Sequence, residues 1–275
     1  MSTRPRRQGR VPTLLLIPGL LLAASACKTP GDDPAPAHSS SSAGASSGAS
    51  KTPSELPSKA PAQAGHPTSP LKNPHGTKPG LAPITTLDDR VSARRVIDQL
   101  RTKGRGPRTG YERDEFGYAW MDTADGVPLA HNGCDTRNDL LRRDGQDLRF
   151  RSGSDCVVTA MTLHDPYTGK TIRWTKSRAT TVQIDHVMPL SYDWQMGAAQ
   201  WPKSKREAIA NDPLNLIPSD GPTNAAKGDS GPASWLPPNK QIRCAYSLRF
   251  AQVSLTYDLP VTAADKRVML AQCDG

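Results

Sequence analysis

The feature that most constrains this chain is a long stretch near its N-terminus that cannot form a core. Residues 28–83 consist mainly of Ser, Ala, Pro, Gly, Lys and Thr and lack periodic aliphatic residues. Such a segment cannot bury enough apolar surface to offset the entropy lost on ordering. Only 36% of the 275 residues are hydrophobic, and the deficit is concentrated here. We expect a disordered tether over residues 27–85, semi-extended where prolines are dense, and one globular domain over residues 86–275.

The first 26 residues have the features of an export signal. Four arginines among the first ten residues precede an apolar run over residues 11–26, which two prolines and a glycine interrupt. The run is too short to span a bilayer stably, and the pattern is typical of a signal peptide. Residues 24–26 fit ordinary signal-peptidase cleavage, whereas residues 22–27 resemble a bacterial lipobox. We expect a lipid on Cys27 that anchors the protein to the outer face of the cell membrane; release is the alternative.

Five cysteines bear on the compartment. Cys27 lies at the expected cleavage point, and the other four lie in the expected domain. Disulfides persist in exported proteins, and four cysteines permit three pairings. We favour Cys134 with Cys156 and Cys244 with Cys273, because each pair closes a loop of moderate length; the crossed pairings stay open. No C-x-x-C spacing occurs, so a structural zinc site is not expected.

The chain is basic, with a formal net charge of +9 and a sequence pI of about 9.5. A basic domain attracts polyanions such as nucleic acid. Many exported proteins are also simply basic, so the charge alone does not decide between these explanations. The same two explanations stay open for a basic loop at residues 101–108, which either follows phosphates or is only solvated.

Local patterns predict a mixed α+β domain. Apolar residues at helical spacing predict helices, and a helix is also expected to begin at Asp135 or Thr136, either of which is placed to cap it. A turn at residues 165–170 between two β-prone runs predicts a hairpin. The other expected helices span residues 88–100, 201–211, 223–228 and 263–272, and the expected strands span residues 156–163, 171–174, 180–187 and 214–218.

The segment that carries chemistry is residues 182–190, with the sequence VQIDHVMPL. A strand there places Asp185 beside His186 and breaks at Pro189. Neighbouring side chains on a strand point to opposite faces, so the two residues can serve one site only if the strand twists or ends there. Pro189 fits such an ending. Residues 215–229 then form a strand, a turn and the start of a helix.

The pattern D-H-V-x-P, followed by N-L and N-x-x-K-G, resembles the ββα-metal motif of HNH nucleases, which the nuclease domain of CRISPR effectors also contains. The span from residue 111 to residue 273 further resembles a bacterial family of secreted HNH proteins of the GmrSD C-terminal type. Further segments that resemble motifs of that family occur at residues 132–139, 165–169, 211–216 and 235–239. The resemblance implies an α+β fold in which helices and a hairpin are added to an HNH ββα-metal core.

The resemblance also implies a metal site and a base. Asp185 and Asn224 correspond to metal ligands, and His186 corresponds to the general base, a role that its ordinary pKa near 6.5 suits. Two oxygen ligands are sufficient for Mg²⁺, or Mn²⁺ in its place, because Mg²⁺ keeps waters and phosphate oxygens in its shell. Asparagine where some HNH proteins have a second histidine disfavours Zn²⁺.

Three further residues receive supporting roles from the same resemblance. Asn215 corresponds to the residue whose side chain braces the loop that carries the histidine. Lys227 and Arg206 are expected near the phosphate as electrostatic support.

We therefore expect an exported, metal-dependent endonuclease, monomeric, that hydrolyses phosphodiester bonds in DNA, with RNA as a second candidate substrate. No base-reading module is visible, so little sequence preference is expected. The alternative is a non-catalytic anchored protein that binds nucleic acid or a cell-wall polymer and keeps only the fold. Such a protein would not need a base beside a metal site.

Other conspicuous residues have structural explanations that we prefer. An isolated Asp-His pair is usually a surface hydrogen bond, and only the wider motif argues for function here. The polar run at residues 135–139 is expected to form a hydrogen-bonded clasp beside a disulfide. Tryptophan side chains can stack on bases, but packing between elements is the preferred role for Trp174, Trp194, Trp201 and Trp235.

Overall fold

The structure is a computed structural model, and it describes residues 65–274. The predictions for the signal peptide, for Cys27 and for residues 27–64 of the tether lie outside the described residues. Among residues 65–274, no helix is both long enough and apolar enough to cross a membrane.

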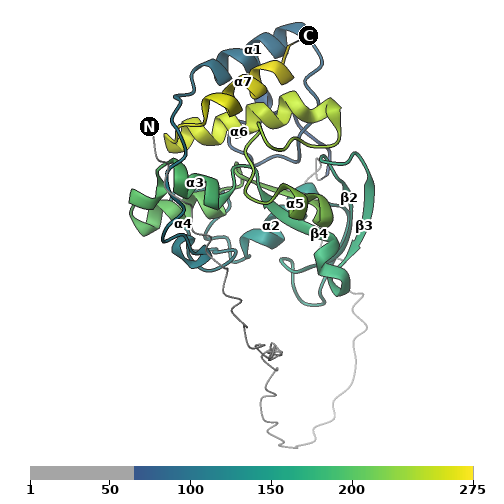
Figure 1. Cartoon of the computed structure of the whole chain (residues 1–275). Coiled ribbons are helices and arrows are strands. Elements are labelled where there is room, and N and C mark those ends of the chain that lie inside the picture. The colour runs from purple at the N-terminus through teal and green to yellow at the C-terminus, as the bar shows by residue number, and fades with distance from the viewer. Residues whose placement is uncertain (1–64, 275) are drawn as a thin grey trace, which may run out of the picture. The chain divides into compact units, whose positions relative to one another are not determined.

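The described residues form an α+β domain (Figure 1). The helices are α1 (Leu87–Asp98), α2 (Thr136–Asp144), α3 (Leu190–Met196), α4 (Lys203–Asn211), α5 (Gly221–Lys227), α6 (Arg243–Tyr257) and α7 (Ala263–Gln272). The strands are β1 (Gln146–Phe150), β2 (Val158–His164), β3 (Thr171–Thr175), β4 (Val182–His186) and β5 (Leu216–Asp220). β1, β2 and β3 form an antiparallel sheet in that order, and β4 pairs with β5 in a second, two-stranded one.

Two hydrophobic cores lie on either side of the β4–β5 pair. The larger core collects α1, α6 and α7, which lie side by side in Figure 1, together with α3 and the end of α4. The smaller core lies between α2 and the three-stranded sheet. Ile184 and Leu216 face the smaller core and Ile217 faces the larger one. The β4–β5 pair is therefore buried on both faces, which fixes its register.

Residues 65–85, which we call the N-terminal strap, pack against the domain. Leu81 and Ile84 are buried in the larger core. The side chain of Asn73 closes a turn by donating to the carbonyl of Lys78 and accepting from its amide. The prediction of a disordered tether was therefore wrong for these residues. The composition of these residues did not indicate an ordered structure, because hydrogen bonds from the domain hold the strap in addition to the burial of its few apolar side chains.

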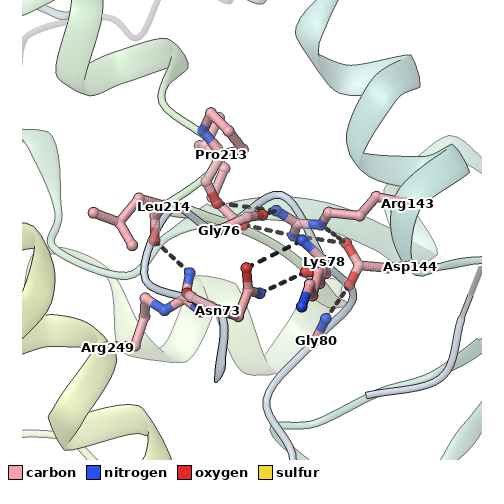
Figure 2. A network of polar contacts seen from close by, with 10 residues as sticks. Asn73, Gly76, Lys78, Gly80, Arg143, Asp144, Pro213, Leu214 and Arg249 are labelled. Atoms are coloured by element: carbon pink, nitrogen blue, oxygen red, sulfur yellow. Dashed lines mark hydrogen bonds and ion pairs between the residues drawn. The ribbon is translucent and has the colours of Figure 1, made fainter. Parts of the chain in front are cut away.

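Two buried arginines join the strap to the segment before β5 (Figure 2). Arg143 and Arg249 each donate to backbone carbonyls on both sides, over distances of 2.5–3.2 Å. The accepting carbonyls are those of Asn73 and Gly76 on the strap and of Pro213, Leu214 and Leu216 beside β5. Asp144 pairs with Arg143 at 2.7 Å and accepts from the amide of Gly80. Buried polar groups need such partners, so the strap is part of the fold.

Both favoured disulfide pairings are confirmed. Cys134 is bonded to Cys156 and Cys244 is bonded to Cys273. The second bridge ties the end of α7 to the start of α6. Chain entropy assigns a bridge that closes a loop of this length a stabilisation of about 3 kcal/mol.

The polar run at residues 135–139 forms the expected clasp beside the first disulfide. Asp135 caps α2 by accepting from the amide of Asn138 at 2.8 Å. The side chain of Asn138 accepts from the amide of Val158, which anchors α2 to the start of β2. Asp139 accepts from the side-chain amide of Asn132 at 3.1 Å.

The expected helices and strands correspond to observed elements whose ends differ by at most two residues. Three elements were missed. Eleven of the fifteen residues of α6 are buried, so this helix has no polar stripe that would give it a helical pattern. Six of the seven residues of α3 are buried as well. β1 is short, and its pairing with β2 is irregular.

The docking of the strap predicts the effect of Gly76→Ala. Gly76 has a φ of +67°, and a Cβ there would lie 2.4 Å from backbone atoms of Leu214. Gly126 has a φ of +75° but open space around it, and Gly104 has open space at an ordinary φ. We expect Gly104→Ala to change the free energy of unfolding by less than about 0.5 kcal/mol and Gly126→Ala to cost about 1 kcal/mol. Gly76→Ala should cost at least about 2 kcal/mol, because the strain of the left-handed backbone and the collision of the new Cβ with the backbone of Leu214 add together.

Urea unfolding of the three variants measures these differences. If Gly76→Ala were as stable as Gly104→Ala, the strap would not be docked as described.

The clasp predicts a pH-dependent stability. Burial raises the pKa of Asp139 to about 6, while the hydrogen bond from Asn132 opposes the rise and the charge of Asp122 adds to it. The folded state therefore binds this proton more tightly than the unfolded state does. The contribution of Asp139 to stability is complete below the unfolded pKa near 3.9 and is lost as the pH rises through about 6. Asp139→Asn, which keeps an acceptor for Asn132, should stabilise the domain by about 1–2 kcal/mol at pH 8 and by little at pH 4.

Urea unfolding at both pH values checks this expectation, with the exposed Asp155→Asn as the control. An equal effect of Asp139→Asn at pH 4 and pH 8 would contradict it.

Candidate active site

β4, β5 and α5 pack together as a ββα unit. Figure 1 shows β4 beside α5. Asp185 pairs with Ile217 and His186 pairs with Leu216 in the antiparallel register. α5 follows β5 without a gap and contacts both strands, whereas α3 and α4 are inserted between the strands. Side chains that pair directly across two strands share a face, so Asp185 faces the larger core with Ile217.

The turn from β5 into α5 has a clear local cause. The side chain of Asp220 caps α5 by accepting from the amide of Thr223 at 2.9 Å and from its hydroxyl at 2.6 Å. Pro222 in the first turn is pre-organised for helical geometry. A Cβ at Gly221 would lie 2.1 Å from the carbonyl oxygen of Thr180, so only glycine fits this approach. These contacts place Asn224 on the first turns of α5.

A pocket of about 460 Å³ opens where β4 ends, and we call it the central pocket. Asp185 and His186 both line it, although they occupy neighbouring positions of the strand, because the strand stops at His186. Its lining consists of Arg108, Tyr111, Arg113, Trp120, Ile184, Asp185, His186, Pro189, Leu190, Ser191, Asn224, Gly228 and Asp229. The structure thus brings together the three residues to which the sequence assigned the metal and the base.

The imidazole of His186 is fixed by the end of α4. Its Nε2 lies 3.0 Å from the carbonyl oxygen of Ala210. A carbonyl oxygen only accepts, so Nε2 carries the proton and Nδ1 of the neutral ring holds the free lone pair. Burial lowers the pKa of His186 to about 3, and the positive charge of Arg113 contributes to the shift. The ring is therefore neutral at neutral pH, but it is a weaker base than its ordinary pKa near 6.5 suggested, so that part of the expectation was wrong for the free protein.

Asn215 holds the chain that follows His186. Its side chain accepts from the amide of Met188 at 2.8 Å and donates to the carbonyl of Met188 at 3.1 Å. It also donates to the carbonyl of Ile209 at 3.3 Å, and its own carbonyl accepts from the amide of Val187. Asn215 is fully buried. These contacts join the exit of β4 to the end of α4.

The carboxylate of Asp185 has two buried partners. Lys227 donates to Oδ1 at 2.8 Å and to the carbonyl oxygen of His186 at 2.6 Å. The hydroxyl of Tyr167 donates to Oδ2 at 2.5 Å. Burial raises the pKa of Asp185 and lowers that of Lys227, and the ion pair between them opposes both shifts. Each carboxylate oxygen has about two acceptor positions, so both keep one for a further partner.

A second buried carboxyl group, Asp193, has no hydrogen-bond partner for either oxygen among the described residues. Burial raises its pKa well above the usual range, and the charge of Lys227 opposes the rise. Asp193 lies on α3 and does not line the central pocket. Of these two buried carboxyl groups, only Asp185 is therefore available to a ligand in the pocket.

The sequence suggested that Lys227 and Arg206 lie where a substrate phosphate would bind. In the structure, neither side chain lines the central pocket. Lys227 is fully buried beneath Asp185, so its ammonium group does not line the pocket. Arg206 donates to Glu115 and to the carbonyl of Trp201, away from the pocket. The motif spacing placed Lys227 on the right helix but could not indicate which way its side chain points.

Arg108 and Arg113 supply the positive charge of the pocket instead. Both are exposed, and Arg108 lies 3.5 Å from Asp229 across the opening. Arg108 belongs to the basic loop for which the sequence left two explanations open. Nothing in the sequence linked Arg113 to the site, because a contact over 70 residues of chain depends on tertiary packing.

Two aromatic residues at the site were also missed. The indole of Trp120 stacks on the His186 ring with an interplanar angle of 14° and ring centroids 6.2 Å apart. Tyr167, which contacts Asp185, lies in the predicted turn at residues 165–170, which resembles the family but which the sequence did not link to the site. By contrast, Trp174 and Trp194 are buried, as expected, and Trp201 and Trp235 pack against the larger core.

The donor set fits a hard cation with few protein ligands. Within residues 65–274, no three His, Cys, Asp or Glu side chains cluster as a metal site. Asp185 and Asn224 are oxygen donors that line the same pocket. The side-chain nitrogen of Asn224 donates to Gln183 at 3.0 Å, which leaves its oxygen for another partner. Such a set suits Mg²⁺, which retains waters and phosphate oxygens.

The part of the chain that contains these residues matches a known domain family. A family model for GmrSD restriction endonucleases, C-terminal domain, matches residues 135–272, which include β4, β5, α5 and Asp185, His186 and Asn224. An uncharacterized secreted protein of Arthroderma benhamiae is 40% identical over 193 residues, which are 68% of this chain and 88% of that protein. No solved structure matches this chain. With half of its length matched by the family model, the chain belongs to the family of GmrSD restriction endonuclease C-terminal domains.

Proposed function

We propose that this protein is a metal-dependent endonuclease that hydrolyses phosphodiester bonds in nucleic acid. Membership of a restriction-endonuclease domain family supports a nuclease-like function. The observation that carries the finer proposal is the central pocket, in which Asp185, His186 and Asn224 lie together with two arginines. A base, two oxygen ligands and positive charge are the groups that phosphodiester hydrolysis requires.

In this proposal His186 is the general base. Its Nδ1 takes a proton from a water whose oxygen forms a new bond to phosphorus, while the bond from phosphorus to the leaving oxygen breaks. The hydrogen bond from Nε2 to Ala210 and the stack on Trp120 hold the ring in position. Burial and, to a smaller extent, Arg113 disfavour the charged imidazolium, and the negative phosphate would oppose the effect of Arg113 when the substrate is bound.

Asp185 and Asn224 would hold a divalent cation, Mg²⁺ or Mn²⁺. When bound, the cation stabilises the negative charge that develops on the phosphate and on the leaving oxygen. Tyr167 and Lys227 hold the carboxylate of Asp185 at the pocket wall. Arg108 and Arg113 attract the polyanion and orient its phosphates.

The substrate we propose is DNA with little sequence preference, and RNA is the second candidate. The competing proposal is an anchored protein that binds nucleic acid or a cell-wall polymer without cleaving it. We also propose export, which is supported by the description of the Arthroderma benhamiae relative as a secreted protein. Attachment through a lipid on Cys27 is part of this proposal, and transfer of a labelled fatty acid to the wild-type chain but not to Cys27→Ala would test it.

Cleavage of supercoiled plasmid DNA and of a long RNA tests the nuclease proposal. Purified protein should convert plasmid to nicked and linear forms with Mg²⁺ or Mn²⁺ and should lose this activity in EDTA, because the phosphate charge is then uncompensated. Protein that binds both polymers but leaves them intact with every divalent ion tried would favour the binding protein.

Variants separate the base from the ligands. His186→Ala should lower the cleavage rate by roughly 10²–10⁴-fold, the usual contribution of a general base, while Mn²⁺ binding measured by EPR stays nearly unchanged. Asp185→Asn and Asn224→Ala should weaken Mn²⁺ binding, and excess metal should restore part of their cleavage. His164→Ala, at an exposed histidine outside the pocket, is the control. A fully active His186→Ala protein would mean that another residue is the base.

A further inference from the structure

A second cavity adjoins the central pocket, and we call it the side cavity. Its volume is about 300 Å³. The two cavities share three wall residues, Trp120, Ile184 and Asn224. Since Asn224 is a proposed metal ligand, whatever occupies the side cavity lies directly beside the phosphate to be cleaved.

Trp120 lines both cavities, and its backbone is strained. Trp120 has a φ of +62°, a left-handed conformation that is an outlier for a bulky side chain. The peptide group between Trp120 and Met121 is held at both its carbonyl and its amide. The carbonyl of Trp120 accepts from the amide of Thr136, and the amide of Met121 donates to the side chain of Asn211. Strain of this kind persists where the surroundings impose it, and it concentrates at functional sites.

The lining of the side cavity matches the chemistry of a nucleotide. Trp120 and Ile184 provide flat and apolar surface, and Gln183, whose side-chain oxygen accepts from Asn224, provides its amide nitrogen for a hydrogen bond. Arg137 provides a cation. Its guanidinium is held over the ring of Trp174 at 5.4 Å and donates to the carbonyl of Val182. Aromatic surface for the base together with positive charge for the backbone is the usual means of binding single-stranded nucleic acid.

We propose that the side cavity binds the base of the nucleotide next to the cleaved phosphodiester bond, with this base stacked on Trp120 and the adjoining phosphate near Arg137. The inference rests on the proposed nuclease function and names the form of its substrate. A base inside a duplex is covered on both faces by its neighbours, so only an unpaired or extruded base can enter. The preferred substrate is then single-stranded nucleic acid.

The test uses a single-stranded oligodeoxythymidylate in which one internal nucleotide lacks its base. The wild-type protein cuts this strand with Mg²⁺, and the cuts at each phosphate are compared within the same reaction. One phosphate beside the abasic position should be cut roughly ten-fold less than the others, because a stacked base contributes about one factor of ten. The comparison does not depend on the overall rate.

Variants of Trp120 then identify the stacking surface. Trp120→Ala should cut all phosphates of the abasic strand evenly, whereas Trp120→Phe should keep the deficit. Tyr118→Ala is the matched control, because Tyr118 is an exposed aromatic residue nearby that lines neither cavity, and it should behave like the wild type. Slower cleavage by Trp120→Ala that retains the deficit would assign Trp120 only to holding the His186 ring and would overturn the proposal.

The salt dependence of binding tests the position of Arg137. With EDTA to prevent cleavage, Arg137→Gln should reduce the slope of log affinity against log salt by about 0.7 for a single strand, and Arg137→Lys should keep it. Arg149→Gln, at an exposed arginine on β1, should leave the slope unchanged. An unaltered slope for Arg137→Gln would overturn the phosphate contact.

The outcomes separate this inference from the function on which it rests. Even cutting of the abasic strand by the wild-type protein overturns the side-cavity proposal and leaves the nuclease intact. Cleavage of plasmid DNA without cleavage of the single strand also overturns the side-cavity proposal, whereas failure to cut plasmid, RNA and single strand alike overturns the nuclease proposal itself.

Discussion

The last turn of α4 leaves backbone carbonyls without partners inside the helix, and the candidate site is assembled from the side chains that satisfy them. His186 donates to the carbonyl of Ala210 and Asn215 donates to that of Ile209. The first contact sets the tautomer of the proposed base, because the proton on Nε2 leaves Nδ1 free. The second fixes the exit of β4 through Met188. Two ordinary hydrogen bonds to a helix end thus orient the proposed base and its supporting loop together.

The segment between α4 and β5 is in turn held from outside the ββα unit. Nη1 of Arg143 donates to carbonyls of both this segment and the N-terminal strap, whereas Arg249 donates to the segment through Nη1 and to the strap through Nη2 (Figure 2). Arg143 also pairs with the buried carboxylate of Asp144, and the loss of that partner would leave a buried charge without compensation, which typically costs about 3–5 kcal/mol. The strap lies outside the span that the family model matches, yet it supports the segment on which the positions of His186 and Asn215 depend. Stability and site geometry therefore share the same contacts.

Sequence reasoning reached the parts of this protein that are local. Asp185 and His186 are neighbours, and Asn224 lies on the helix that follows the next strand, so one ββα motif places all three. The disulfides followed from loop length and compartment. The direction of Lys227, by contrast, depends on which element covers α5, and Arg113 and Trp120 reach the pocket only through packing of a segment that is mostly irregular. The strap was misjudged because its partners, Arg143 and Arg249, lie far along the chain and no local pattern reports them.

In the proposed reaction, the free Nδ1 of His186 removes the proton from the attacking water. Chemical rescue measures this most directly. His186→Gly opens space beside a pocket of about 460 Å³, into which added imidazole can enter. Cleavage of plasmid DNA by this variant should rise with imidazole concentration and saturate, while Asn224→Ala, which keeps the base, should not respond. A His186→Gly protein that imidazole leaves inactive while its Mn²⁺ binding matches the wild type, or equal rescue of both variants, would contradict the assignment.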